Sequence, residues 1–194
     1  MTKTIINTAL LLVSIGLAYY LVKIIKDPIK FDKESAIRKE VVINRLKDVR
    51  TAQLAYKDLK GNFAGNFNTL INTLKNEDFP KVKIIGNPDA AEADTSIVVE
   101  YDTTWIPMFE HAFGEGYPKD SLDFLRWVPY SDNKVELEIA AGIITENRTV
   151  KLPVFEVSAP EEIVYAGLFK EKIDYDHKFT VGSLTKATYS GNWE

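Results

Sequence analysis

The chain has 194 residues with a net charge of −4; 45% of the residues are hydrophobic and 27% are charged, which excludes a chain that is disordered throughout. It contains no cysteine, and this excludes disulfides, zinc–thiolate sites and cysteine nucleophiles. Its two histidines are too few for a metal site built from histidine alone.

The charge is unevenly distributed along the chain. Residues 1–60 carry 12 Lys and Arg against 6 Asp and Glu, whereas residues 61–194 carry 12 against 22. A basic segment beside a membrane is attracted to anionic headgroups. The acidic remainder argues against nucleic acid as a partner.

The first apolar stretch, Thr4–Ile25, predicts a membrane-spanning helix. At 1.5 Å per residue its length is roughly 33 Å, which matches the hydrocarbon core of a bilayer. Residues typical of the membrane interface stand at its end: Tyr19, Tyr20, Lys23 and Lys26. A cleaved signal peptide is the alternative, but the apolar run is longer than usual and no Ala-x-Ala site follows it.

The sequence leaves the orientation of this span open. The lysines and arginines that follow the span outnumber those before it, and by the positive-inside rule they place the following domain in the cytoplasm. A short basic tail before a first apolar span is instead how an exported signal anchor begins. We expect export.

A break is expected after the span, where Asp27-Pro28 begins a polar joint. Asp32 then caps a long amphipathic helix over Lys33–Lys60. The stripe along this helix is an interaction seam made of Val42, Leu46, Val49, Gln53 and Tyr56. It packs either on the helix's own domain, which the short length and the glutamine favour, or against another chain as a coiled-coil seam.

A second helix is expected to follow and to form an αα-hairpin with the first. Gly61 ends the long helix, Asn66 caps the second one and Pro80 closes it. The apolar face of the second helix consists of Phe67, Leu70, Ile71 and Leu74.

From about residue 81 the hydrophobic period changes to two, which predicts β-strands. Strands are expected at Val82–Ile85, at Ile97–Tyr101 beyond a polar loop over Asn87–Thr95, in a three-stranded antiparallel meander over Asp123–Tyr130, Val135–Ile144 and Thr149–Val157, and at Phe179–Leu184. A helix is expected from Pro160 to about Phe169, and a loose tail up to Glu194.

These elements predict an α+β protein with three parts. A transmembrane anchor covers residues 1–26, a linker and αα-hairpin stalk covers 27–80, and an antiparallel β-rich domain covers 81–194. The long helix and the hairpin are expected to pack on the antiparallel sheet.

Four segments of the sequence resemble known families. The run RLKDVRTAQLAYKDLKGNFAGNFNTLINTL, a membrane-rooted helix before a short helix and antiparallel strands, resembles type IV pilins and pseudopilins over the first third of the chain. The prepilin peptidase motif is absent, because no Gly-Phe pair with a Glu five residues on precedes the apolar run. The chain also resembles a group of uncharacterised single-span bacterial envelope proteins in three later segments, WVPYSDNKVELEIAAG, LPVFEVSAP and VGS…GNWE. The resemblance implies a single-pass protein of the bacterial inner membrane with a periplasmic domain.

Side chains suited to catalysis or metal binding are few and scattered. His111 lies in an apolar surrounding, where a hydrogen-bonded, partly buried histidine is the ordinary outcome. Asp174-x-Asp176-His177 offers oxygen ligands but lacks the glycine and the distal glutamate of an EF-hand loop. Core packing explains Trp105 and Trp127 better than partner contacts do. We expect no catalytic, cofactor or metal site.

The function expected from these features is structural rather than enzymatic. The chain is predicted to be a membrane-anchored structural or assembly component of a bacterial envelope complex that acts through protein–protein contacts. Its expected partners are the lipid bilayer and other envelope proteins or further copies of itself. The alternatives are a pilin-like filament subunit and a membrane-tethered sensor or enzyme, which the lack of a convergent titratable cluster disfavours.

Overall fold

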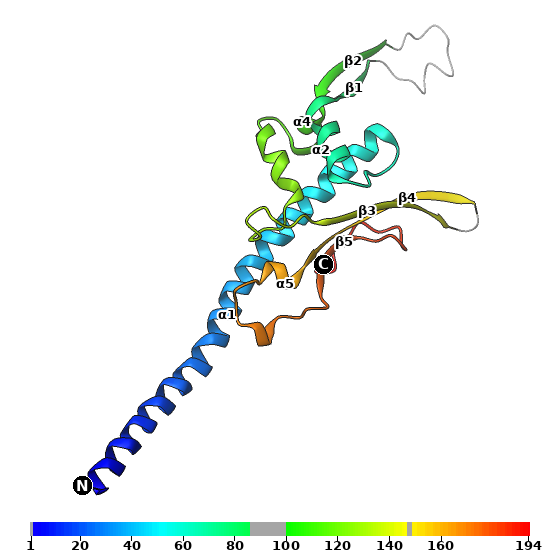
Figure 1. Ribbon diagram of the computed structural model, residues 1–194. Helices are drawn as coiled ribbons and strands as arrows, with labels where there is room; N and C mark the ends of the chain where they lie inside the picture. Colours follow the sequence, from blue (N-terminus) through cyan, green and yellow to red (C-terminus); the bar gives the residue numbers. More distant parts are fainter. Residues whose placement is uncertain (1, 86–99, 147–148) are drawn as a thin grey trace.

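The computed structural model describes residues 2–85, 100–146 and 149–194, and it is α+β with small antiparallel sheets. In chain order the elements are α1 (Thr2–Lys60), α2 (Phe67–Asn76), β1 (Asp78–Ile85), β2 (Glu100–Pro107), α4 (Met108–Phe113), η1 (Lys119–Arg126), β3 (Glu138–Glu146), β4 (Val150–Pro160), α5 (Glu161–Val164), η2 (Lys170–Lys172) and β5 (Lys178–Gly182). Figure 1 shows α1 as a rod whose N-terminal half projects alone, while the other elements gather around its C-terminal half.

Helix α1 runs unbroken through Asp27-Pro28, so the prediction of a joint over residues 27–33 is wrong. A proline inside a helix removes one backbone donor, and a helix can absorb this loss where its surroundings hold it. Here Phe31, just beyond the proline, is 8% exposed, and its ring stands edge-on to Tyr165 with the centroids 5.6 Å apart. Asp32 does not cap a helix; its carboxylate accepts a hydrogen bond from Lys172 at 2.6 Å.

The αα-hairpin forms where the caps predicted it. Gly61 has a φ of +77° and its N–H donates to the Lys57 carbonyl at 2.7 Å, as a glycine does at a helix end. Asn66 caps α2, because its side-chain oxygen accepts from the Thr69 N–H at 2.8 Å. Pro80 does not close α2, which ends earlier; it lies inside β1.

The three-stranded antiparallel sheet has the order β3-β4-β5. Its strands β3 and β4 overlap the last two strands of the predicted meander, but the predicted first strand is not part of the sheet. The expected first strand, Asp123–Tyr130, begins instead in the 3-10 helix η1, and Trp127 makes only an isolated bridge with Glu136. The reason is the spacing of three between the buried Leu122 and Leu125, which suits a 3-10 turn and not a strand. The place of the third strand is taken by β5, which lies where Phe179–Leu184 was expected.

The remaining predictions fall partly inside the described residues. Val82–Ile85 lies within β1, which pairs with β2 in a two-stranded antiparallel ribbon. Of the strand expected at Ile97–Tyr101, residues 97–99 lie outside the described residues, as does the loop Asn87–Thr95. The helix expected from Pro160 is only the short α5.

One hydrophobic core holds the domain together, and we call the part of the chain that shares it the head. It contains residues of α1, α2, η1, β4 and β5, among them Leu46, Leu70, Leu125, Phe155 and Val181. The predicted boundary between residues 27–80 and 81–194 therefore falls inside β1 and divides a shared core.

The part of α1 before Asp27 contributes no described side chain to this core. Its apolar side chains are exposed, for example Leu12 at 64% and Leu17 at 58%. An 18-residue window of the helix has a mean hydropathy of 2.0 and none of it is buried within the protein. The helix is thus long and apolar enough to cross a membrane, although signal sequences also meet this criterion.

Candidate membrane-facing site and interaction surfaces

The residues predicted for the membrane interface lie on the projecting part of α1. Tyr19 is 71% exposed and Tyr20 is 59% exposed, and Lys23 and Lys26 are exposed as well. All four belong to the part of α1 that precedes Phe31, the first residue of the helix in the core. Aromatic rings and lysines in this position suit the depth of lipid headgroups.

The predicted interaction seam is buried inside the protein's own domain. Val42, Leu46, Val49 and Gln53 have no exposed surface, and Tyr56 is 8% exposed. Two interpretations of this stripe were open, packing on the helix's own domain and a coiled-coil seam to another chain. In the structure the stripe packs on its own domain. As an interface to another chain the seam is not accessible while the domain is folded.

Gln53 makes two hydrogen bonds that the sequence did not predict. Its side-chain amide donates to the Ala64 carbonyl at 2.8 Å, and its side-chain oxygen accepts from the Ala64 N–H at 2.9 Å. Both groups are buried, so one glutamine satisfies two backbone groups of the turn between α1 and α2. The sequence feature that pointed to a buried hydrogen bond here is a polar residue in an otherwise apolar stripe.

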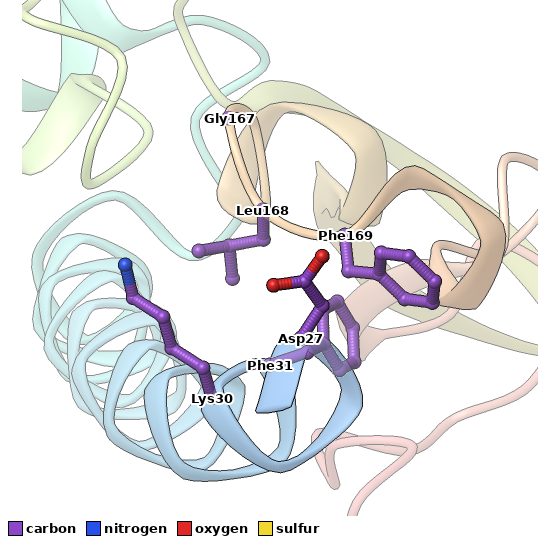
Figure 2. Close-up of a pocket in the computed structure, with 6 residues that line it drawn as sticks. All are labelled: Asp27, Lys30, Phe31, Gly167, Leu168 and Phe169. Carbon is purple, nitrogen blue, oxygen red and sulfur yellow. The ribbon is translucent and has the colours of Figure 1, made fainter. Parts of the chain in front are cut away.

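A cleft lies where α1 leaves the head. Asp27, Lys30 and Phe31 of α1 form one wall, and the loop Gly167–Phe169 forms the other, around a volume of about 280 Å³ (Figure 2). No local sequence pattern indicates this cleft, because its two walls come from distant parts of the chain.

Three contacts next to the cleft fix the loop on α1. Lys172 pairs with Asp32 at 2.6 Å. The Arg38 guanidinium donates to the carbonyls of Val164 and Ala166, both at 3.0 Å. The loop is therefore attached to the helix on both sides of Gly167–Phe169.

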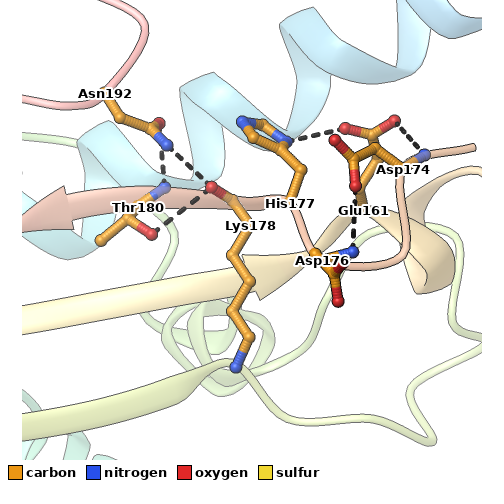
Figure 3. Close-up of polar contacts among 7 residues, drawn as sticks. All are labelled: Glu161, Asp174, Asp176, His177, Lys178, Thr180 and Asn192. Atoms are coloured by element: carbon orange, nitrogen blue, oxygen red, sulfur yellow. Dashed lines mark hydrogen bonds and ion pairs between the residues drawn. The ribbon is translucent and has the colours of Figure 1, made fainter.

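The acidic run before β5 folds onto a neighbouring glutamate (Figure 3). The His177 ring nitrogen Nδ1 lies 2.7 Å from Glu161 Oε2, and the Asp174 N–H donates to the other oxygen of Glu161 at 3.3 Å. The Asp176 N–H donates to the Asp174 carboxylate at 3.0 Å. These bonds close the loop between α5 and β5.

Within residues 2–85, 100–146 and 149–194, no group of three or more His, Cys, Asp or Glu side chains is placed to hold a metal ion.

His111, on α4, is held between an aromatic ring and a carboxylate. Its imidazole stacks on Phe79 with the centroids 3.7 Å apart, and its Nε2 lies 3.4 Å from the Asp58 carboxylate. These contacts join α4 to β1 and to α1, which is a structural arrangement.

The C-terminal tail is bound to the head, contrary to the prediction of a loose tail. Asn192 donates to the Lys178 carbonyl at 2.7 Å and accepts from the Thr180 N–H at 3.1 Å, both on β5 (Figure 3). Glu194 pairs with Arg50 of α1 at 2.8 Å. The Arg50 hydrogen bond holds the pKa of the Glu194 carboxyl below its usual value. The final residues therefore connect the sheet to α1.

Burial shifts the pKa of several groups around α1. Desolvation raises the pKa of Asp48 and lowers the pKa of Arg45, and the two charges partly offset this through their mutual attraction. Burial also raises the pKa of Tyr165 to about 12, with a smaller contribution from Glu161.

Four large apolar side chains are exposed on the described strands, namely Val82, Trp105, Ile143 and Val150, and the two most exposed are Trp105 and Ile143. Trp105 on β2 is 64% exposed, so its predicted place in the core is wrong; Trp127 is partly buried. The reason is that the β1–β2 ribbon projects from the head as a two-stranded sheet (Figure 1). Ile143 on β3 is 65% exposed, and β3 forms one edge of its sheet. Exposed apolar residues on edge strands are candidate contacts for another protein.

Comparison with protein-family models, with curated proteins and with solved structures found no match to this chain.

Proposed function

We propose that this protein is a membrane-anchored structural or assembly component of a bacterial envelope complex and that it acts through protein contacts of its head. The observation that carries the proposal is the single unbroken helix α1, bare and apolar in its first half and buried in the head in its second half. Such a rod holds the head at a fixed distance from a bilayer, since no joint separates the anchor from the core.

The continuity of α1 also supports a retained anchor over a cleaved signal peptide. Removal of about the first 20 residues would cut α1 in the middle of a helical stretch, before Phe31 reaches the core. The apolar run has no other place to be buried within the described residues. A bilayer is the environment that such a surface requires.

The proposed location is the bacterial inner membrane, with the head on the periplasmic side. This orientation follows from the likeness of the short basic N-terminus to a signal anchor. A reporter that is active only outside the cytoplasm, fused after Glu194, is expected to be active. Activity of a reporter that works only in the cytoplasm would contradict the orientation and leave the anchor intact.

The proposed contact surface consists of the exposed residues Trp105 and Ile143 on the strands of the head. To test it, a photo-crosslinking residue is placed at each position in full-length protein in its native membranes. The matched control position is Lys134, which is 78% exposed in a polar turn. We expect a discrete adduct with another envelope protein at Trp105 or Ile143 and none at Lys134. The same adducts at all three positions, or none at any of them, would contradict the proposal.

A pilin-like filament subunit is the second candidate. The same unbroken helix supports it. One half of α1 is bare and the other half packs against the antiparallel sheet, which is the arrangement that the pilin resemblance implies. In that case the bare halves of neighbouring copies pack against one another. Adducts between copies at Leu12, together with filaments in electron micrographs, would favour this function; adducts only with other proteins would favour the first.

A further inference from the structure

The cleft at the base of the head lies at the depth of lipid headgroups if Thr4–Ile25 fills the hydrocarbon core, so this inference rests on the proposed membrane anchor. Asp27 and Lys30 follow Ile25 by two and five residues, which places them about 3 and 7.5 Å beyond the core along a straight helix. The headgroup layer of each leaflet is about 5 to 8 Å thick. The loop Gly167–Phe169 faces this part of α1, so the cleft opens into the headgroup layer.

The cleft offers one negative and one positive group that nothing else in the described part of the chain engages. Neither the Asp27 side chain nor the Lys30 side chain has a hydrogen bond or ion pair with any described residue. Figure 2 shows the Asp27 carboxylate directed into the space before the loop, with Leu168 between it and the Lys30 side chain. Two charged side chains farther along the helix do have partners: Asp32 pairs with Lys172, and Arg38 donates to two carbonyls.

We propose that this cleft binds the headgroup of a zwitterionic aminophospholipid. The Lys30 ammonium binds the phosphate, and the Asp27 carboxylate accepts hydrogen bonds from the lipid's ammonium group. Leu168 and Phe169 contact the glycerol and upper acyl region, since they are the apolar part of the wall. The lipid thereby holds the base of the head against the bilayer.

The charge pattern distinguishes this ligand from other phospholipids. An anionic lipid without an ammonium group brings its phosphate close to Asp27, and the two negative charges repel. A choline headgroup carries a positive charge but has no N–H to donate to the carboxylate. An ethanolamine headgroup supplies both the charge and the donors.

The lipid preference is tested by native mass spectrometry of the full-length protein, released from micelles that contain equal amounts of phospholipids with an ethanolamine, a choline or a glycerol headgroup. We expect the ethanolamine lipid to be retained at least several-fold over the other two. Asp27→Asn and Lys30→Gln are each expected to abolish the preference. The matched control Lys33→Gln, an exposed lysine of the same helix that does not line the cleft, is expected to keep it. Equal retention of the three lipids, retention of the glycerol lipid instead, or variants that behave like the wild type would overturn the proposal.

A depth measurement separates the failure of this inference from the failure of the anchor. The chain has no cysteine, so a single fluorophore can be attached at Leu12→Cys, at Glu171→Cys next to the cleft, or at Lys81→Cys on β1. In vesicles we expect quenching by acyl-chain nitroxides at position 12, quenching by headgroup nitroxides at position 171, and neither at position 81. An unquenched position 12 contradicts the anchor itself. A quenched position 12 with an unquenched position 171 overturns only the headgroup contact.

Discussion

Gln53 is the side chain whose removal should most directly open the turn between α1 and α2. Replacing it by Met keeps the length of the side chain but leaves the buried N–H and C=O of Ala64 without partners. Each unsatisfied group costs about 1 to 3 kcal/mol, so we expect Gln53→Met, which leaves two of them, to lower the free energy of unfolding by about 2 to 6 kcal/mol. Urea unfolding of the detergent-solubilised protein, followed by circular dichroism, measures this loss. The control Lys47→Met, at an exposed position of the same helix, should change it little.

The burial of Gln53 was predictable from the sequence, but its partner was not. The position continues the spacing of Val42, Leu46 and Val49, which fixes the face of the helix on which the side chain lies. Ala64 belongs to a turn whose path depends on how α2 folds back, and no local pattern encodes that path. If Gln53→Met unfolded like the wild type, the two hydrogen bonds would contribute nothing to stability.

Glu138 connects the three strands of the larger sheet in a pH-dependent manner. Its carboxylate, on β3, accepts from Lys178 of β5 at 2.7 Å and from Ser158 of β4 at 3.0 Å. The Lys178 hydrogen bond, followed by that of Ser158, lowers the pKa of Glu138 from its ordinary 4.5. A lowered pKa in the folded state means that the ionised group stabilises the fold above pH 4.5 and that this contribution disappears as the pH falls through the folded value.

We therefore expect the melting temperature of Glu138→Gln to lie below that of the wild type at pH 7 and to meet it below pH 4.5. The side chain is 56% exposed, so solvent screening keeps the difference under about 1 kcal/mol. Thermal melts across this pH range measure the convergence. Glu162→Gln, at an exposed position of α5, serves as the control and should run parallel to the wild type. A gap that stays constant with pH would contradict the role of Glu138.

Helix α1 packs one of its faces into the core of the head. Leu46 has no exposed surface, whereas Ile37 on the same helix is 50% exposed. Leu46→Ala is expected to lower the free energy of unfolding by about 2 to 5 kcal/mol, because it removes buried contacts and leaves a cavity. Ile37→Ala should cost much less. Similar losses at both positions in urea titrations would mean that the buried face has been assigned wrongly.

The same helix should behave as one rigid rod across Pro28. Lys23 and Lys39 lie on either side of the proline, and a straight helix separates them by about 24 Å along its axis. Spin labels at Lys23→Cys and Lys39→Cys in the reconstituted protein are expected to give one narrow distance distribution near that value. A broad distribution extending to shorter distances would restore the joint that the sequence suggested.

The elements that the sequence predicted well are those fixed by nearby residues. The cap at Asn66 and the glycine at position 61 define the hairpin through contacts within four residues. The break at Pro28 and the strand at Asp123–Tyr130 were wrong because distant contacts decide those stretches. Phe31 is held by Tyr165, and the buried Leu122 and Leu125 draw η1 onto the core.

At the scale of the whole molecule, the sequence predicted the α+β class and the apolar first helix but not the cleft at the base of the head. Composition and hydrophobic period are enough for the first two. The cleft depends on the pairing of Asp32 with Lys172, which are 140 residues apart. Contacts of such separation follow from the complete fold and leave no trace in a local pattern.

The proposed function requires α1 to remain whole and to anchor the head in a membrane. The decisive experiment is intact-mass spectrometry of the 194-residue protein, recovered from membranes after an alkaline wash. The expected result is a single species in the membrane pellet at the full mass of 21.9 kDa. Release of the protein by the wash, or a mass that lacks about the first 20 residues, would contradict the anchor.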